Sequence, residues 1–367
     1  MRVLHLVKGL GPGGAERLLV SMAAAADPAV VRHEVAYLLD WKQHLVPELE
    51  ALGVPVHLLA GPTGMRDRRW PGRLRSLARQ AHVVHLHSPA VATVARPLLR
   101  SIRGGPAVVS TEHNLWSSHG LPTRAGNALT LPLDRVRWAV SEEVVRSAWK
   151  PWRARTEVLV HGIPLAALQA RRSQRSAARA AQGWADDDVV VAIVANLRVH
   201  KDYPTLFAAA ALAMAEKPRL RFVSIGQGPL EAELRADLAR RGLGERLVML
   251  GYHDDPPAVV AGADVFTLSS IHEGLPISLL EAMALGLAPV VTDVGGNAEV
   301  VTDGVDGLLV PPRRPEALAD AFVRLARDPA ERARLSAAAA HRAGAFDVAR
   351  TARTVEARYQ SLVAAGS

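Results

Sequence analysis

Two glutamates eight residues apart, Glu273 and Glu281, have the spacing in this 367-residue chain that best suits the binding of a sugar. Glu273 begins the turn Glu273-Gly274-Leu275-Pro276 after an apolar run, and Glu281 lies about two turns into the helix predicted next. Since eight residues complete about 2.2 helical turns, both carboxylates are predicted to face one mouth. Carboxylates that accept two hydrogen bonds can hold the vicinal hydroxyls of a ribose or a hexose. A solvated helix glutamate is the alternative for Glu281.

A glycine-rich loop, Gly9-Leu10-Gly11-Pro12-Gly13-Gly14, joins the first predicted strand to the first predicted helix. Its G-x-G-x-x-G spacing, with Asp40 at the end of the second strand, fits a dinucleotide fold and therefore an NAD(P)-dependent oxidoreductase. The same loop suits other phosphates, because its N–H groups and the helix N-terminus attract any anion. The loop alone leaves both classes open.

Two groups of residues invite a metal site, and neither predicts one. His85 and His87 alternate along a strand and share a face, but no third ligand is evident in the sequence, so a packing or cleft-lining role is favoured. Asp186-Asp187-Asp188 comes before its strand, at the end of the sheet away from ligands. The chain has no cysteine, which excludes a disulfide scaffold, a thiolate zinc site and a cysteine nucleophile.

Short apolar runs that alternate with amphipathic segments predict two doubly wound, Rossmann-like α/β domains in tandem, 1–170 and 171–345, followed by a helix over 346–367. The strands predicted in the first half are Val3–Val7, Glu34–Leu39, Val83–His87, Ala107–Thr111, Val136–Val140 and Val158–Val160. Those in the second half are Val189–Ala195, Arg221–Ile225, Leu247–Leu250, Val265–Leu268, Ala288–Val291 and Gly307–Val310. Ligands of such sheets bind beyond the carboxyl ends of the strands, so a cleft between the domains is the expected site.

The net charge of +8 is unevenly distributed. Residues 1–180 hold 25 Lys and Arg against 12 Asp and Glu, whereas the rest of the chain holds 19 against 24. Arginines crowd around Trp70 in 66–79, which suits either a solvated helix or peripheral contact with an anionic membrane. No nucleic-acid motif accompanies the charge. No membrane span or signal peptide is evident, so a cytoplasmic protein is expected.

The pattern Glu-x7-Glu, followed by Gly286–Gly296, resembles the donor-site signature of the retaining glycosyltransferases of family four, which have the GT-B fold. Further segments resemble motifs of the family in the expected order along nearly the whole chain. These are Gly13-Gly14-Ala15-Glu16, His113, Ser141-Glu142, His161-Gly162-Ile163 and Gly226-Gln227-Gly228-Pro229-Leu230.

The resemblance assigns roles to individual residues. Glu273 would bind hydroxyls of the donor sugar and Glu281 the nucleotide ribose, while Lys201 matches the lysine that neutralises the diphosphate. Asn196 stands where many members have arginine, and Arg198 either supplies that charge or is simply exposed. His113 matches a histidine that faces the donor, a buried structural histidine being the alternative. The other donor-binding residues expected are Gly13, Gly14, Gly274, Leu275, Pro276, Gly295 and Gly296.

These matches predict a hexosyltransferase that needs neither a metal ion nor a resident cofactor, and the acidic run Asp254-Asp255 therefore holds no cation. The donor would be a UDP- or GDP-sugar bound to the second domain. The acceptor would be a glycan or a lipid-linked intermediate of cell-surface polysaccharide synthesis, bound to the first domain. The terminal helix would cross back to the first domain, with a cap on the second domain alone as the alternative. A catalytically silent sugar-nucleotide-binding module also stays open.

Overall fold

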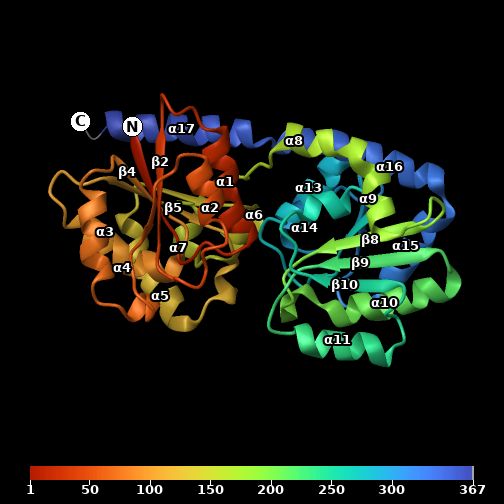
Figure 1. Ribbon diagram of the computed structural model, residues 1–367. Coiled ribbons are helices and arrows are strands. Elements are labelled where there is room, and N and C mark those ends of the chain that lie inside the picture. The colour runs from red at the N-terminus through yellow and green to blue at the C-terminus, as the bar shows by residue number, and fades with distance from the viewer. Residues whose placement is uncertain (366–367) are drawn as a thin grey trace. The chain divides into compact units, whose positions relative to one another are not determined.

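The computed structural model describes residues 1–365 and divides the chain into two compact units (Figure 1). The first unit consists of residues 1–162 and of the chain from Val348 onward, and the second consists of Ile163–Asp347. Each unit is built on one parallel sheet. The boundary lies before the helix α8 (Leu165–Ala170), so this helix belongs to the second unit, whereas the sequence placed the boundary at residue 170.

The sheet of the first unit has the strand order β3-β2-β1-β4-β5-β6-β7. Five of the six strands predicted for it are present with bounds that shift by at most two residues, and β7 shrinks to a pair of residues at the sheet edge. The sequence missed β3, which has only three residues and pairs with β2 alone. The strands are β1 (Arg2–Leu6), β2 (Arg32–Tyr37), β3 (Val56–Leu58), β4 (Val83–Leu86), β5 (Ala107–Glu112), β6 (Val136–Ala139) and β7 (Glu157–Val158).

Alternation along these strands sends apolar side chains to both faces of the sheet, so each face needs a cover of helices. One face, with Leu4 and Leu6, packs on α3 (Trp70–Ala78) and α4 (Pro89–Arg100). The opposite face, with Val3, packs on α1 (Gly14–Ala25) and α17 (Val348–Ala364). The remaining helices of the unit are α2 (Val46–Ala51), α5 (Leu121–Thr130), α6 (Glu142–Ser147) and α7 (Lys150–Arg153), with short 3-10 helices at Gly64–Arg66, Trp116–Ser118 and Leu131–Leu133.

The terminal helix α17 lies beside α1, as the predicted crossover requires (Figure 1). Val348, Ala352, Val355 and Tyr359 are buried, which follows from their spacing of three and four residues. The hydroxyl of Tyr359 lies 2.6 Å from Nδ1 of His85 on β4. The alternative of a helix that caps the second unit alone is therefore wrong.

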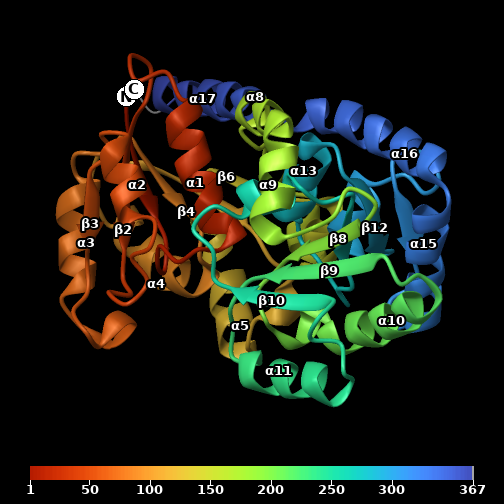
Figure 2. The same ribbon diagram turned by 45° about the vertical axis from the view of Figure 1, so that its right-hand side comes forward.

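The second unit contains a six-stranded sheet with the order β10-β9-β8-β11-β12-β13, all of whose strands were predicted. Figure 2 shows β8, β9 and β10 side by side, with α10 and α11 along one side of them. The strands are β8 (Val189–Val194), β9 (Leu220–Ile225), β10 (Leu247–Gly251), β11 (Val265–Leu268), β12 (Ala288–Thr292) and β13 (Leu308–Val310). Besides α8, the helices are α9 (Arg175–Gln182), α10 (Tyr203–Glu216), α11 (Glu231–Arg240), α12 (Pro256–Val260), α13 (Ile277–Leu285), α14 (Gly295–Val300), α15 (Pro315–Arg327) and α16 (Pro329–Arg342), with 3-10 turns at Arg171–Gln174, Val199–Lys201 and Ala343–Phe346.

Across residues 1–365, no helix combines the length and the apolar character needed to cross a bilayer.

Candidate active site

Three neighbouring strands of the second sheet, β8, β11 and β12, end at the same edge and carry the loops that hold most of the predicted site. The loop after β8 holds Arg198 and Lys201, the loop after β11 holds Glu273, and the loop after β12 leads into α14 at Gly295. The carboxyl edge of a parallel sheet is where open α/β folds bind ligands. Residues 72 positions apart in the sequence, Lys201 and Glu273, meet here.

The centre of this edge is an ion pair between Lys201 and Glu273. Nζ of Lys201 donates to Oε1 of Glu273 at 2.5 Å, and the hydroxyl of Ser270 donates to the same oxygen at 2.6 Å. The Glu273 side chain is 8% exposed and that of Lys201 is 15% exposed, so water screens the pair weakly. The hydroxyl of Ser269 donates to the carbonyl oxygen of Lys201 at 2.8 Å, which joins the two loops. The pair can therefore offer one ammonium group and one carboxylate to a ligand from a fixed scaffold.

Glycines allow the loops to approach one another closely. A Cβ atom on Gly296 would lie 2.0 Å from the carbonyl oxygen of Gly274, and one on Gly226 would lie 2.0 Å from that of Ala195. No side chain fits at such distances. The amide of Gly296 donates to the carbonyl oxygen of Glu273 at 3.3 Å, so this N–H group supports the loop of the ion pair. Leu275 and Pro276, also predicted, continue that loop, with Leu275 packed on the core and Pro276 next to the start of α13.

Two histidines that the sequence did not single out lie next to the ion pair. The rings of His200 and His272 stack with centroids 4.9 Å apart, and the amide of Ile271 donates to the carbonyl oxygen of His200 at 2.8 Å. Burial and the ammonium group of Lys201 lower the pKa of His200 to about 4. The His200 ring is therefore neutral at pH 7, and Lys201 rather than His200 is the cation beside Glu273. Arg198 begins the same turn and its side chain is exposed, which places a second cation at this edge.

Glu281 has different neighbours from Glu273. It lies on α13 and lines a small pocket with the end of β8 and the start of α12. The pocket is lined by Val194, Pro256, Pro257, Val260, Ser278, Glu281, Ala282 and Leu285. Apart from Ser278 and Glu281 its walls are apolar, and it has room for about one water molecule.

In the first unit, the predicted residues Gly13 and Gly14 begin α1 and His113 follows β5. A Cβ atom on Gly13 would lie 2.3 Å from a carboxylate oxygen of Glu16, but this oxygen is the end of a flexible side chain and φ of Gly13 is −87°, so the turn does not itself require glycine. Asp40, the residue of the oxidoreductase hypothesis, lies three residues beyond the end of β2 at Tyr37 and not at the strand end. Nε2 of His113 lies 3.1 Å from Nδ1 of His87, and its ring stacks on that of His161. Desolvation, with a smaller contribution from His161, lowers the pKa of His113 to about 3.

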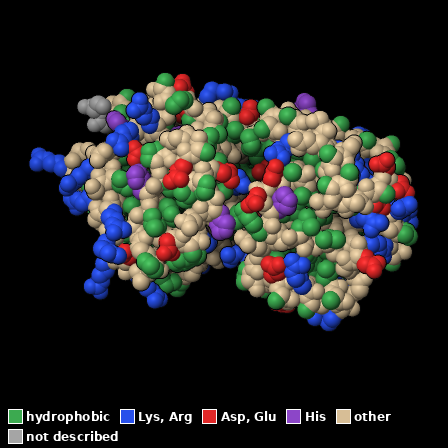
Figure 3. Space-filling model, in the orientation of Figure 1, with side chains coloured by type: hydrophobic (Ala, Val, Ile, Leu, Met, Phe, Trp, Pro, Cys, Tyr) green, Lys and Arg blue, Asp and Glu red, His purple; other side chains and the backbone are tan. Residues whose placement is uncertain are grey.

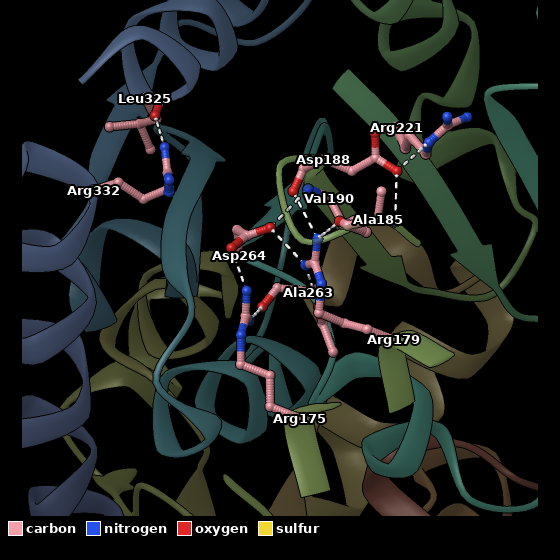
Figure 4. A network of polar contacts seen from close by, with 11 residues as sticks. Arg175, Arg179, Ala185, Asp188, Val190, Arg221, Ala263, Asp264, Leu325 and Arg332 are labelled. Atoms are coloured by element: carbon pink, nitrogen blue, oxygen red, sulfur yellow. Dashed lines mark hydrogen bonds and ion pairs between the residues drawn. The ribbon is translucent and has the colours of Figure 1, made fainter. Parts of the chain in front are cut away.

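The acidic run before β8 belongs to a structural network at the opposite edge of the second sheet (Figure 4). Oδ2 of Asp188 accepts from Nε of Arg221 at 2.6 Å and from the amide of Ala185 at 3.0 Å. Asp264 accepts from both Arg175 and Arg179. Asp188 is 3% exposed; its Oδ2 is used within the protein, whereas its Oδ1 has no hydrogen-bond partner and lies 3.6 Å from Nη1 of Arg219.

The sequence suggested that the arginines of 66–79 and Trp70 share one surface, and the structure agrees only for arginines of this segment. Lys and Arg side chains gather over the edge of the first unit that carries α3 (Figure 3). Trp70, however, is the first residue of α3, is 3% exposed and packs in the core. Arg69 is paired with Asp67 at 2.9 Å. Trp70 is thus a core residue, and it offers no ring to a membrane.

Comparisons with known proteins agree with this geometry. The family model of the glycosyl transferases group 1 matches residues 174–342. A D-inositol 3-phosphate glycosyltransferase from Nocardioides sp. is 30% identical over 359 residues, with 84% of this chain and 76% of the relative covered. A putative glycosyltransferase, EpsD of Bacillus subtilis (strain 168), is 27% identical over 245 residues, 62% of this chain and 63% of the relative.

A crystal structure of HepE from Anabaena in complex with UDP and glucose shares the fold of this chain. It superposes with a TM-score of 0.86 at 22% identity and covers 98% of this chain and 100% of that one. The arrangement of two parallel α/β sheets with a returning terminal helix is thus the GT-B fold. Together with the match over 174–342 and the relative from Nocardioides, these findings show that the chain belongs to the group 1 glycosyl transferases.

Proposed function

We propose that the protein is a retaining, metal-independent hexosyltransferase that uses a nucleotide diphosphate sugar as donor. The observation that carries this proposal is the Lys201–Glu273 pair, in which a cation and a carboxylate stand 2.5 Å apart at the carboxyl edge of the second sheet. A donor of this class needs both groups, because its diphosphate is anionic and its sugar presents hydroxyls. An NAD(P)-dependent oxidoreductase has no use for this pair.

The chemical task is to stabilise charge on the departing diphosphate. Transfer from an anomeric carbon passes through a transition state that resembles an oxocarbenium ion, and negative charge accumulates on the leaving group. Lys201, with Arg198 in the same turn, would neutralise that charge in the place of a metal ion. In the retaining mechanism proposed, the acceptor attacks from the face of the leaving group, and a phosphate oxygen takes its proton. His113 would contact the donor, as the family resemblance implies.

The two glutamates would divide the recognition of the donor. Glu273, oriented by Ser270, would accept from hydroxyls of the transferred sugar. Glu281, at the edge of the small pocket formed with Val194 and Pro256, would accept from hydroxyls of the ribose. The solved structures of HepE contain UDP and UDP-glucose, so a uridine nucleotide is the first donor to test.

The acceptor would be a glycan or a lipid-linked glycan bound to the first unit near the Gly11–Gly14 loop. Relatives named for a diphosphoundecaprenol-linked acceptor and for lipopolysaccharide core synthesis support an acceptor of this class. The excess of Lys and Arg in residues 1–180 would favour such anionic substrates. The same charge would support a cytoplasmic location with peripheral contact at the inner face of an anionic membrane.

A screen of UDP- and GDP-sugars tests the donor. Because a ligand at about 100 times its dissociation constant stabilises a protein by about 2.7 kcal/mol, the correct nucleotide raises the melting temperature measurably. Product analysis by NMR with a lipid-linked acceptor then reports the anomeric configuration in the presence and absence of EDTA. Inversion of configuration would contradict the retaining mechanism, and loss of activity with EDTA would contradict metal independence. Binding without any product would identify a silent binding module.

A further inference from the structure

Six histidines lie together in the first unit, within or next to the sheet face that α1 and α17 cover. The register of the strands brings the first of them together: His5 on β1 stands opposite His85 on β4, and His33 on β2 stands opposite Val3. Residues two apart on a strand share a face, so His87 extends this row beyond the end of β4. Ring contacts connect the six histidines, which are His5, His33, His85, His87, His113 and His161.

Four of these rings form one continuous line of nitrogen contacts. Nδ1 of His33 lies 2.8 Å from Nε2 of His5, and Nδ1 of His5 lies 3.0 Å from Nε2 of His87. Nδ1 of His87 in turn lies 3.1 Å from Nε2 of His113. All three distances are those of hydrogen bonds. Each inner ring therefore uses Nε2 toward one neighbour and Nδ1 toward the other.

The rings in this line are neutral at pH 7. Desolvation by burial lowers the pKa of His33 to about 4, and burial is also the largest cause that holds the pKa values of His5 and His87 well below 6.5. His113, with its pKa of about 3, completes the set. A neutral imidazole has one N–H donor and one bare nitrogen acceptor. Each contact thus needs one hydrogen between its two nitrogens.

This requirement couples the tautomers. If His33 carries its hydrogen on Nδ1, then His5 must accept at Nε2 and carry its own hydrogen on Nδ1, and the same follows for the next two rings. If His33 carries its hydrogen on Nε2, the other three rings carry theirs on Nε2 as well. A mixture would leave one contact with two hydrogens or with none, which is costly in a buried site.

We propose that His33, His5 and His87 are positioning residues for His113, because their hydrogen-bonded chain fixes which tautomer His113 adopts. The nitrogen of His113 that the chain does not use, Nδ1, is then a donor or an acceptor according to the state of all four rings. The coupling stands on the geometry of the first unit, and its use in catalysis rests on the proposed function. A diphosphate offers only acceptor oxygens, so bound donor should favour Nδ1–H on all four rings.

A metal ion is the competing explanation for this cluster. Nitrogens of His5, His85 and His87 lie within 4.8 Å of one another. All six ring nitrogens of these residues, however, already have hydrogen-bond partners: His85 contacts Tyr359 and Thr111, and the others contact members of the chain. A bound metal would have to break several of these contacts, so the hydrogen-bonded chain accounts better for the observed distances.

NMR of the full-length protein with ¹⁵N-labelled histidine tests the coupling, since Nδ1 and Nε2 of each ring have shifts that depend on the tautomer. In the wild type without ligand, all four rings should show one tautomer, and with UDP bound all four should show Nδ1–H. Different tautomers among the four rings, or a stoichiometric transition metal in the purified protein, would overturn the coupling. If all four rings share one tautomer but UDP does not change it, the coupling stands and the proposed contact between His113 and the phosphates is wrong.

Variants give a second, independent readout. His5→Leu breaks the chain two rings away from His113 and should move the ¹⁵N shifts of His113 toward the average of both tautomers. His85→Leu is the matched control, because His85 is equally buried on the same face but lies outside the chain. We expect kcat to fall on the order of tenfold to a hundredfold in His5→Leu, with the donor KM unchanged, and to change little in the control. Equal effects of both variants on His113 would overturn the proposal, and His33→Phe replaces His5→Leu if the latter does not fold.

Discussion

Nζ of Lys201 lies 2.5 Å from Oε1 of Glu273, and this contact ties the loop after β8 to the loop after β11. Each residue neutralises the other while no ligand is bound. A donor would bring phosphate oxygens to Lys201 and sugar hydroxyls to Glu273. The ammonium group and the carboxylate can each make further hydrogen bonds besides the one between them, and these would bind the donor. Variants of Lys201 and Glu273 should therefore affect sugar transfer.

Lys201→Ala should lower kcat by about 100-fold or more, because the ammonium group acts mainly on charge that develops in the transition state. Arg198→Ala is the control from the same turn and should lower kcat less, since its side chain is exposed. Steady-state kinetics with the donor identified in the screen provides the measurement. Turnover at the wild-type rate in Lys201→Ala would refute the assignment of the diphosphate clamp.

Glu281→Ala should weaken the binding of free nucleoside diphosphate, because the ribose loses its carboxylate partner. We expect a loss of about tenfold, the scale of one charge-assisted hydrogen bond. Glu273→Gln should leave that affinity within about twofold but reduce sugar transfer strongly. Isothermal titration calorimetry with UDP separates the two effects, and similar losses of UDP affinity in both variants would show that the roles are wrongly divided.

The stability of the first unit should fall as the pH decreases below about 6.5. The folded state keeps His5, His33, His85 and His161 neutral, with pKa values lowered mainly by burial, to about 4 for His33 and His161. The unfolded chain, with pKa values near 6.5, binds protons that the folded state does not bind. The contribution of these neutral histidines to the stability is thus complete above the pKa of the unfolded chain, near 6.5, and it is lost as the pH falls below that value.

Each such histidine should remove about 1.4 kcal/mol of unfolding free energy per pH unit below 6.5. Urea unfolding between pH 8 and pH 5 measures this slope. His85→Phe should reduce this slope by the contribution of one proton. An unfolding free energy that stays constant from pH 7 to pH 5 would contradict the neutral state of the cluster.

Asp188→Ala should destabilise the second unit by about 3 kcal/mol, because it removes one of the two carboxylates of a buried network. Asp187→Ala offers a close comparison, since Asp187 pairs with Arg219 at the surface and both side chains are about 60% exposed. That substitution should cost less than about 1 kcal/mol. Thermal unfolding measures both. Equal stability of the two variants would mean that the network in Figure 4 contributes little to the unfolding free energy of the second unit.

The sequence was sufficient for the parts of the fold that depend on local patterns. Short, mostly apolar runs identified every strand except β3, whose three residues lie at a partly exposed edge. The spacing of Val348, Val355 and Tyr359 identified the buried face of α17. These features depend on periodicity, which is a property of neighbouring residues.

Contacts between distant residues were not accessible in this way. Periodicity showed that His85 and His87 share a face, but the third member of their group, His5, became evident only with the register of β1 against β4. The stacking of His200 on His272 likewise depends on two loops meeting at one sheet edge. Trp70 shows the converse error, because its arginine-rich neighbours suggested a surface for a residue that the fold buries.

The return of α17 to the first unit has a consequence for the synthesis of the protein. The core beside α1 contains Val3 and Met22 together with Val355 and Tyr359. The ribosome makes these two pairs at opposite ends of the chain, with all of Ile163–Asp347 translated between them. At about 5 to 20 residues per second, roughly 10 to 40 seconds separate the emergence of the first sheet from that of its final helix. The second unit, which is continuous in sequence, can complete its core during that interval, so the half of the protein that is translated first finishes folding last.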